Sequence, residues 1–430
     1  MNRTHHYFTR ALLRVCLLLG LLPTGAKAQL FGGMIKANSP IVLASNQNFF
    51  VSSIYDTDYL PYTAPSGAGT TGTQAANGLT NDPGETAVNV QGQITTTGVT
   101  VYIPCTTTTS GTLPAYSTTV TIPAAVTEDG VSRDVTLSWA SQAYTLATKS
   151  IKATLQAVGG TLNVKKLDIN AGIGNNYLGV LLGQLVYPIN TVGATSTFSV
   201  RDLPGIPDKM FGLADNGGVV RHNFLYLPVV GEDGKVWLNN NLGADYANIN
   251  STSFNTNQQA TAYTDYHAYG SLFQYGRKPD GHELISWSAS NTGTPVNTST
   301  ATLSDNPTDA LFITNAVSGF WQVSTIPDQW RGVASVNNPC PVLYRLPNLA
   351  DIQAMATNSG ATTAAGCNGK ALGLTMPGYR NNGGGNPYNM GSALYYMDND
   401  GGAWSPNTYI PPQYYMYPRA IGGSVRCIRN

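Results

Sequence analysis

The sequence predicts a mainly β protein with few helices, in which a β-sandwich-like region is followed by a C-terminal domain of mixed α and β structure. Three observations lead to this prediction. Between residues 88 and 204, apolar and polar residues alternate in many short segments, which is the period of strands with one buried face. Turn residues separate these segments at regular intervals, as in sandwiches. One clear helical pattern occurs, after Asn348.

The first 28 residues predict a secretory signal peptide. Three arginines precede or interrupt an apolar run over residues 11–22, and Ala26-Lys27-Ala28 fits the small-x-small pattern before a cleavage site. The run is too short to span a bilayer as a helix, and no later run is long enough. We therefore expect an exported protein, extracellular or on the outer cell surface, whose mature chain begins near Gln29.

Charge and cysteine content narrow the function classes. Charged residues make up only 11% of the chain, against about 25% in typical soluble domains. Cleavage removes four basic and no acidic residues from 23 of each, leaving a net charge of about −4. Nucleic acid is therefore excluded as a partner. The remaining cysteines lack the close spacing of a zinc site, and no cofactor is expected; they are Cys105, Cys340, Cys367 and Cys427.

Four segments of the expected mature chain follow one another. Residues 29–87 are read as an N-terminal strand and linker region, with short strands at 41–43 and 49–51. Residues 88–204 form the sandwich-like domain, with a turn at 128–130 and a hairpin closed by Gly159-Gly160, because glycine tolerates positive φ. Residues 203–207 mark a junction with few contacts across it. Residues 205–430 form the last domain.

The helix after residue 348 has recognisable ends and faces. Asn348 can cap its N-terminus, and Asp351 suits the positive end of the helix dipole. Its apolar side is formed by Leu349, Ile352, Met355 and Ala356.

Four motifs in the C-terminal half resemble one family. Residues 234–242, 268–277, 338–347 and 422–428 are similar, in this order, to the segments "dG.vWm..NL", "yG.lY.wg", "nPCP.GwRlPt" and "G.SVRCi". These segments belong to the Fibrobacter succinogenes major paralogous domain, found in exported bacterial proteins. The resemblance covers about half of the chain, from residue 205 to residue 430. Leu343-Tyr344 departs from the family's Gly-Trp pair.

The resemblance implies a layout and a role. The layout is C-type-lectin-like, with few helices, small sheets and a long irregular region. The role is at the cell surface, commonly adhesion, with no established enzymatic activity. Cys340 and Cys427 lie in shared motifs, so we expect a disulfide between them; a Cys340–Cys367 pair is the rival. Arg345 and Arg426 flank these cysteines and should hold backbone carbonyls or carboxylates.

No arrangement of residues predicts catalysis. The segment from His282 to Ser286 begins like a zinc-protease helix, but the second histidine is missing. Asp398 and Asp400 could ligate calcium on a flexible turn, although the glutamate of an EF-hand loop is absent. A solvated acidic turn is the favoured interpretation, so we assign no metal.

Aromatic residues near the C-terminus are the candidate binding residues. Core packing, a protein interface and a glycan platform are all consistent with them; they are Tyr395, Tyr396, Trp404, Tyr414, Tyr415 and Tyr417. The sequence favours a non-catalytic protein for adhesion or binding, of glycans, polymers or a surface protein. The alternative is a structural subunit that self-associates into an extracellular polymer or surface layer.

Overall fold

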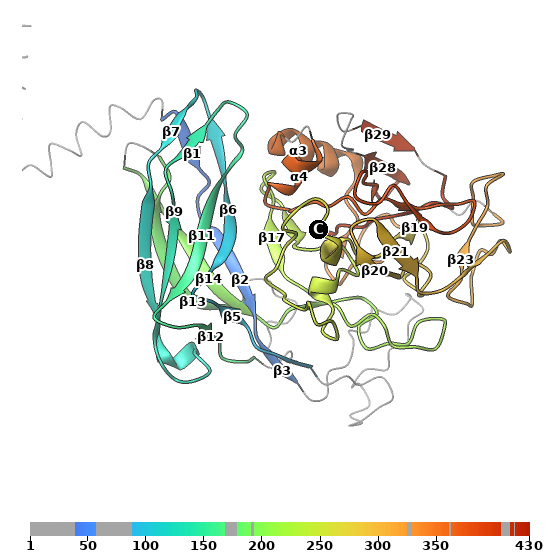
Figure 1. Cartoon of the computed structure of the whole chain (residues 1–430), viewed down its shortest axis with the longest axis horizontal. Coiled ribbons are helices and arrows are strands. Elements are labelled where there is room, and N and C mark those ends of the chain that lie inside the picture. The colour runs from blue at the N-terminus through green and yellow to red at the C-terminus, as the bar shows by residue number, and fades with distance from the viewer. Residues whose placement is uncertain are drawn as a thin grey trace, which may run out of the picture.

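The computed structural model describes residues 39–56, 88–167, 179–190, 193–324, 329–360, 363–405, 413–416 and 418–430. The expected signal peptide lies outside these residues. Two domains lie side by side, a β-sandwich and a larger domain of short strands (Figure 1). The prediction of a mainly β fold with few helices is confirmed. Within the described part, no helix has the length and apolarity to cross a membrane.

Two sheets form the sandwich. The first has the order β1 (Ile41–Leu43), β6 (Val99–Thr107), β11 (Ser150–Val158), β9 (Arg133–Trp139) and β8 (Tyr116–Ile122). The second has the order β13 (Val180–Pro188), β14 (Thr195–Leu203) and β2 (Gln47–Ser52). Two small ribbons pair β7 (Gly111–Leu113) with β10 (Gln142–Tyr144) and β5 (Gln93–Ile94) with β12 (Leu162–Asn163). Alternate residues bury Ile103, Leu137 and Leu155 between the sheets, as period two requires.

The first strands belong to the sandwich, which therefore begins before residue 88. The strands expected at 41–43 and 49–51 are present as β1 and β2. β1 pairs with β6 in one sheet, while β2 runs parallel to β14 in the other. Asn46, at a φ of 54°, turns the chain between them, and asparagine tolerates this conformation better than most residues.

Of the two expected turns, one is confirmed and one is wrong. Residues 128–130 follow a short 3-10 helix, η2 (Ala124–Val126), between the paired strands β8 and β9. Gly159 and Gly160 do adopt positive φ, but no hairpin forms. Both edges of β11 are already taken by β6 and β9, so β12 pairs with β5 instead.

The junction between the domains is packed, contrary to the expectation of few contacts. Leu203, Ile206 and Phe50 are buried in one cluster with residues of the second domain. β15 (Ile206–Pro207) pairs with β16 (Leu225–Tyr226). A ribbon of β3 (Ile54–Asp56) and β4 (Val88–Val90) packs on Phe211. Apolar burial, rather than a linker, therefore joins the domains.

The second domain is built from small sheets. One contains β17 (Pro228–Val230), β18 (Val236–Leu238), β31 (Ile428–Arg429) and β24 (Tyr344–Arg345). Another contains β19 (Phe273–Gln274), β30 (Gly422–Gly423), β25 (Tyr379–Arg380) and β26 (Pro387–Tyr388). The rest are β20 (Ile285–Ala289) with β21 (Thr292–Pro295), β22 (Ser299–Thr300) with β23 (Phe312–Ile313), and β27 (Tyr396–Met397) with β28 (Gly402–Ser405) and β29 (Gln413–Met416).

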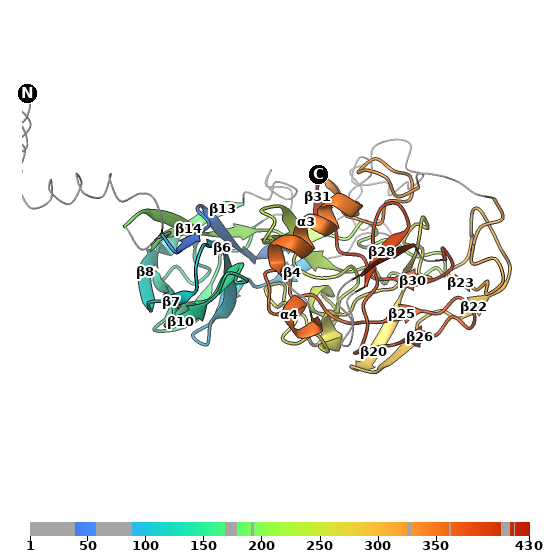
Figure 2. The ribbon, with the colours of Figure 1, turned by 90° about the horizontal axis from the view of Figure 1, so that it is seen from above.

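Helical segments are short. They are η3 (Asp245–Ala247), η4 (Tyr266–Ala268), α3 (Leu349–Ser359) and α4 (Ala364–Asn368). Both views place α3 and α4 on the side of the second domain that faces the sandwich (Figure 2). The predicted capping is confirmed: the Asn348 side chain accepts from the Asp351 amide at 2.9 Å, and the Asp351 carboxylate accepts from the Asn348 amide at 3.0 Å. Ile352 and Met355 are buried.

The predicted disulfide between Cys340 and Cys427 is confirmed, and it links positions 87 residues apart. Cys105 and Cys367 are free and buried, so the rival pairing is wrong. The expectation for the neighbouring arginines also holds. Arg345 binds the Asp351 carboxylate at 2.7 Å, and Arg426 donates to the carbonyls of three residues, Leu238, Asn239 and Leu372.

Candidate functional site

The predicted aromatic residues do not form one exposed surface. Tyr396 and Trp404 are each 4% exposed and lie opposite one another on β27 and β28. The Tyr396 hydroxyl donates to the Asn241 side chain at 2.7 Å. A binding role for these two residues is therefore wrong, because core packing removes both rings from solvent. Tyr395 is half-buried, with its ring 4.6 Å from that of Tyr379.

The remaining predicted tyrosines are only partly placed. The backbones of Tyr414 and Tyr415 pair on β29 with Trp404 and Ala403. Their side chains, and Tyr417 as a whole, lie outside the described residues. A binding role for these three stays a prediction.

The weak calcium candidates form a closed turn. Asp398 is buried, and its Oδ1 accepts hydrogen bonds from the amides of Asp400 at 2.9 Å and Gly402 at 2.8 Å. The Asp400 carboxylate pairs with Arg331 at 2.6 Å. The oxygens that calcium would need therefore bind N–H groups. Asp400 is exposed to solvent as expected, whereas Asp398 is not, because it orders the turn.

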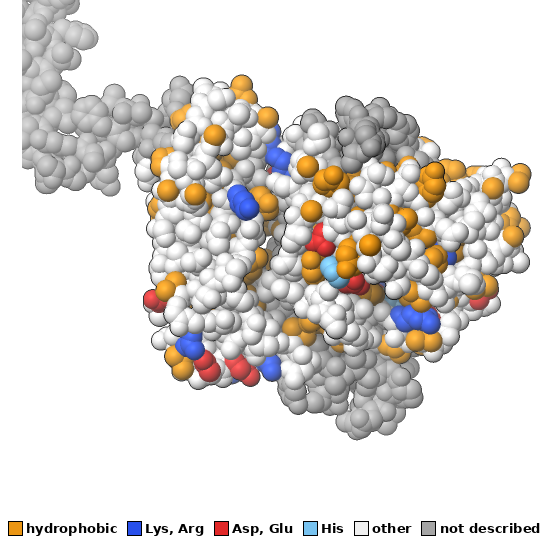
Figure 3. Space-filling view, viewed as in Figure 1, with side chains coloured by type: hydrophobic (Ala, Val, Ile, Leu, Met, Phe, Trp, Pro, Cys, Tyr) orange, Lys and Arg blue, Asp and Glu red, His pale blue; other side chains and the backbone are white. Residues whose placement is uncertain are grey.

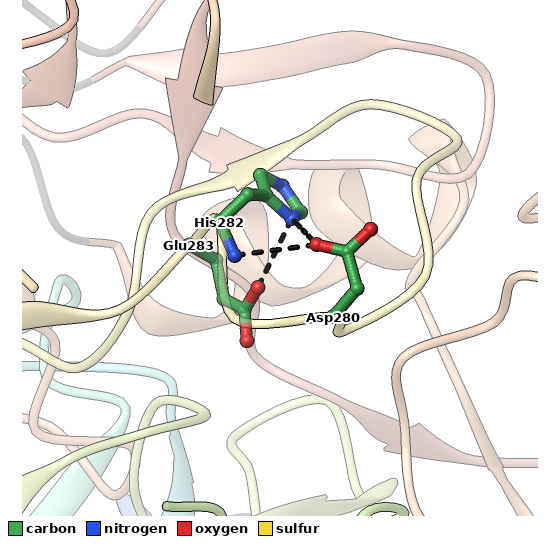
Figure 4. Close-up of side chains that lie close together, drawn as sticks. All are labelled: Asp280, His282 and Glu283. Carbon is green, nitrogen blue, oxygen red and sulfur yellow. Dashed lines mark hydrogen bonds and ion pairs between the residues drawn. The ribbon is translucent and has the colours of Figure 1, made fainter. Parts of the chain in front are cut away.

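Asp280, His282 and Glu283 form a compact cluster in which one side-chain atom of each lies within 4.8 Å of the others (Figure 4). The backbone amide of Gln274 donates to His282 Nε2 at 3.0 Å. Nε2 therefore carries no proton, and Nδ1 donates to Asp280 at 2.8 Å. Both ring nitrogens are occupied, so His282 is not free to bind a metal ion.

The carboxylates of this cluster are also saturated. Glu283 Oε1 contacts His222 Nε2 at 2.6 Å, and Asp280 Oδ2 accepts from Arg277 at 2.8 Å. Burial raises the pKa of Glu283, but hydrogen bonds from His222 and His282 outweigh it and lower that pKa overall. Burial likewise lowers the pKa of His222, but the hydrogen bond to Glu283 and nearby carboxylates raise it overall to about 9. All of these groups are sealed from solvent, so the cluster is structural.

A groove between the domains is the candidate binding site. It encloses about 660 Å³, within the range of about 300–1,000 Å³ that small-ligand sites span. β4, β5, β6 and β11 form one wall, and residues 254–261 and 368–373 form the other. The surface seen in Figure 3 carries few and scattered charges.

Side-chain amides are the commonest polar groups in the groove. They are Asn89, Gln91, Gln93, Asn255, Asn257, Gln258, Gln259 and Asn368. Several of their nitrogens are held by the chain itself: Gln91 donates to Val164 at 2.8 Å, Gln259 to Ala371 at 2.8 Å and Gln93 to Asn163 at 2.8 Å.

These internal hydrogen bonds use the amide nitrogens and leave the amide oxygens available to a ligand. Within the described part of the chain, no group donates to the side-chain oxygens of Gln91, Gln93, Gln258, Gln259 or Asn368. Asn257 Oδ1 is buried and has no described partner, so it is not offered to a ligand, and the Asn257 nitrogen reaches the Gln93 carbonyl at 3.5 Å across the groove. The groove therefore presents acceptors, which suit a ligand rich in hydroxyl donors.

Aromatic rings complete the groove. Tyr102 and Phe254 line it and are half-buried. Burial raises the pKa of Tyr102, and the charge of Glu232 adds to this, so the phenol stays protonated at neutral pH. A narrower recess of about 70 Å³ shares Tyr102 and Val99 and continues to Phe49. Rings at this position can stack on apolar faces of a ligand.

Sequence reasoning missed this groove. The run Asn255-Thr256-Asn257-Gln258-Gln259 was a signal for it, because five uncharged polar residues in a row cannot form a buried strand. Alternating residues predicted strands in the region that contains Tyr102, but the proximity of Tyr102 to this run depends on contacts between the domains.

Comparisons with known proteins add no relatives. No family model matches the chain, and neither does any curated protein or solved structure. The family resemblance therefore stays a proposal, and function is argued from the groove.

Proposed function

We propose that the chain is an exported, non-catalytic adhesion protein that binds a glycan in the groove between its domains. The observation that carries this proposal is the row of side-chain amide oxygens, in a groove that no described Asp or Glu lines. Sugar hydroxyls donate to such oxygens, and the rings of Tyr102 and Phe254 can pack on sugar faces.

A non-catalytic role is supported by the sealed cluster. Catalysis requires an acid, base or nucleophile that a substrate can reach. The cluster of Asp280, His282 and Glu283 is at most 1% exposed, and its polar atoms bind one another. The resemblance to exported surface domains supports the same role and a location outside the cell.

Glycan binding by the purified mature chain tests the proposal. We expect hits on a glycan array, and weaker binding of each hit by the variants Gln93→Ala and Gln258→Ala, because no described group donates to either side-chain oxygen. Both residues line the groove, one on each wall. Asn306→Ala is the matched control, because Asn306 is an exposed amide outside the groove. A folded chain that binds no glycan, or equal losses in all three variants, would contradict the proposal.

Self-assembly is the second candidate, and exposed apolar residues favour it. Val317, Val323 and Val336 in the second domain are 100%, 71% and 62% exposed, and apolar side chains on this domain reach the surface in Figure 3. Exposed apolar residues can mark protein interfaces. Sedimentation over a range of concentrations tests this: oligomers that Val317→Ser and Val323→Ser disperse, without glycan hits, would favour a structural subunit.

A further inference from the structure

Two lysines are the only charged side chains among the described residues that line the groove. Lys152 lies on β11, on the sandwich wall, directly opposite Tyr102 of β6. Lys370 follows α4 on the other wall. Neither ammonium forms an ion pair with a described carboxylate. The groove therefore has a cation on each side, in a chain with a negative net charge after cleavage.

One carboxylate lies behind this site. Glu232 is largely buried and accepts from the Ala371 amide at 2.7 Å. Burial raises the pKa of Glu232, and the charge of Lys370 opposes this rise. Glu232 does not line the groove, so a ligand meets the two ammoniums rather than the carboxylate. The charge of Glu232 also reaches Tyr102 in the groove, but two ammoniums against one carboxylate leave a net positive charge, which favours an anion.

We propose that the ligand of the groove is an acidic glycan, whose hydroxyls donate to the amide oxygens while its acidic groups accept from Lys152 and Lys370. This inference rests on the proposed glycan-binding function. Two kinds of contact would recognise the ligand: the amide oxygens accept hydrogen bonds from its hydroxyls, and one lysine on each wall binds its acidic groups. Carboxylates and sulfates both suit an ammonium, which binds as a point charge.

The placement of the two lysines on opposite walls adds selectivity. A ligand that carries acidic groups on both of its edges can engage both lysines. Neutral glycans make the amide contacts alone. Charge contacts at a partly exposed site weaken with ionic strength, so salt separates the two contributions.

Four polymers test the proposal: polygalacturonate, dextran sulfate, neutral dextran and polyglutamate. They are titrated against the mature chain and its variants Lys152→Gln, Lys370→Gln and the double variant. Lys165→Gln is the matched control, because Lys165 is exposed on the sandwich and does not line the groove. Melting temperatures confirm that each variant is folded.

We expect an acidic polysaccharide to bind more tightly than dextran, and each groove lysine to contribute roughly three- to tenfold. Binding should weaken between 50 and 200 mM salt, and Lys165→Gln should have no effect. Preference for polygalacturonate assigns carboxylates, and preference for dextran sulfate assigns sulfates. Equal binding of dextran, unchanged by either groove variant, overturns the acidic ligand but leaves the glycan groove standing.

Two other outcomes would also overturn the inference, because each would show that the groove does not recognise an acidic glycan specifically. Polyglutamate bound as tightly as polygalacturonate shows that charge alone is recognised. Equal losses in Lys165→Gln show that attraction is spread over the surface. If neither these polymers nor a glycan array gives binding, the proposed function fails together with the inference.

Discussion

The two domains satisfy their buried backbone groups in different ways. In the sandwich, strands of up to nine residues pair along their length, and the core between them is apolar. In the second domain, strands have two to five residues. There, buried polar side chains take the place of the missing ladders: Arg426 donates to three carbonyls, and Gln274 donates to the carbonyls of Ile313 and Ala420.

This difference shows what irregular structure requires. Nearly every buried carbonyl must find a donor. A ladder supplies donors from the backbone of any sequence that pairs, so the sandwich needs only the right pattern of apolar residues. A domain without long ladders needs particular side chains, such as Arg380, which donates to the carbonyls of His282, Asn297 and Gly385.

Of the changes proposed here, replacing Arg426 should lower the free energy of unfolding the most. It is also the sharpest test of the difference between the two domains. Arg426→Met keeps much of the volume but leaves three carbonyls and the Asn241 oxygen without this donor. At about 1–3 kcal/mol for each unsatisfied group, partly relieved by relaxation, we expect a loss of about 5 kcal/mol. Leu155→Ala in the sandwich should cost about 3 kcal/mol through a cavity. Urea denaturation measures both, and a smaller loss for Arg426→Met would break the comparison.

Removing the Cys340–Cys427 disulfide should cause the second-largest loss of stability. The bond closes a loop within the second domain, across 87 residues, and a loop of this length is worth about 4–5 kcal/mol in the chain-entropy model. Reduction, or Cys340→Ala with Cys427→Ala, should therefore lower the melting temperature of the second domain. Hydrogen exchange resolves the two domains. Equal loss of protection in the sandwich would show that the domains unfold as one unit.

The sequence predicted features that depend on neighbours along the chain. Alternating residues indicated the strands, and Asn348 with Asp351 indicated the helix and its cap. The disulfide followed from the family motifs. Long-range pairings could not be predicted this way: β2 joins β14 some 150 residues later, and Gly159-Gly160 closes no hairpin because β11 has no free edge.

The groove and the buried arginines could not be predicted from the sequence either. Arginine is seldom fully buried, so its burial at positions 277, 380 and 426 depends on carbonyls that only the fold brings together. The groove requires Tyr102 and residues 255–259 to meet across the two domains. Tyrosine pairs near the C-terminus were a stronger pattern, but Tyr396 is core.

Buried titratable groups should make the stability of both domains depend on pH. Burial raises the pKa of Asp202, in the sandwich, to about 8, although backbone hydrogen bonds lower it. Its unfolded pKa is about 3.9, so the folded state holds a proton that the unfolded state releases. The stability that Asp202 contributes is present below about pH 4 and is lost as the pH rises to about 8. In the second domain, Glu283, whose pKa is lowered, contributes stability that is lost in acid. The stability that His222 contributes, with its pKa raised to about 9, is instead lost as the pH rises to about 9.

The variant Asp202→Asn tests how much of the pH dependence of stability comes from Asp202 in the sandwich. Asparagine does not ionise, so we expect this variant to be about 2 kcal/mol more stable than the parent chain at pH 8, with a flatter profile from pH 4 to 8. The full shift would convert to about 6 kcal/mol, but relaxation around an ionised carboxylate reduces it. Denaturation at several pH values measures the profile. An unchanged slope in Asp202→Asn would show that another group controls it.

The smallest effect is expected at Asp400, where an exposed pair contrasts with the buried network of the same domain. The Asp400 and Arg331 side chains are 41% and 55% exposed, and pairs of this kind contribute at most about 1 kcal/mol. Asp400→Asn should therefore change stability by about 0.5 kcal/mol. Asp398→Ala should cost about 2 kcal/mol, because two backbone amides lose their acceptor.

Calcium at 1 mM should leave the melting temperature of the parent chain unchanged, since Asp398 Oδ1 already accepts two N–H groups. A rise that grows with calcium concentration and disappears in Asp400→Asn would instead establish a calcium site on this turn.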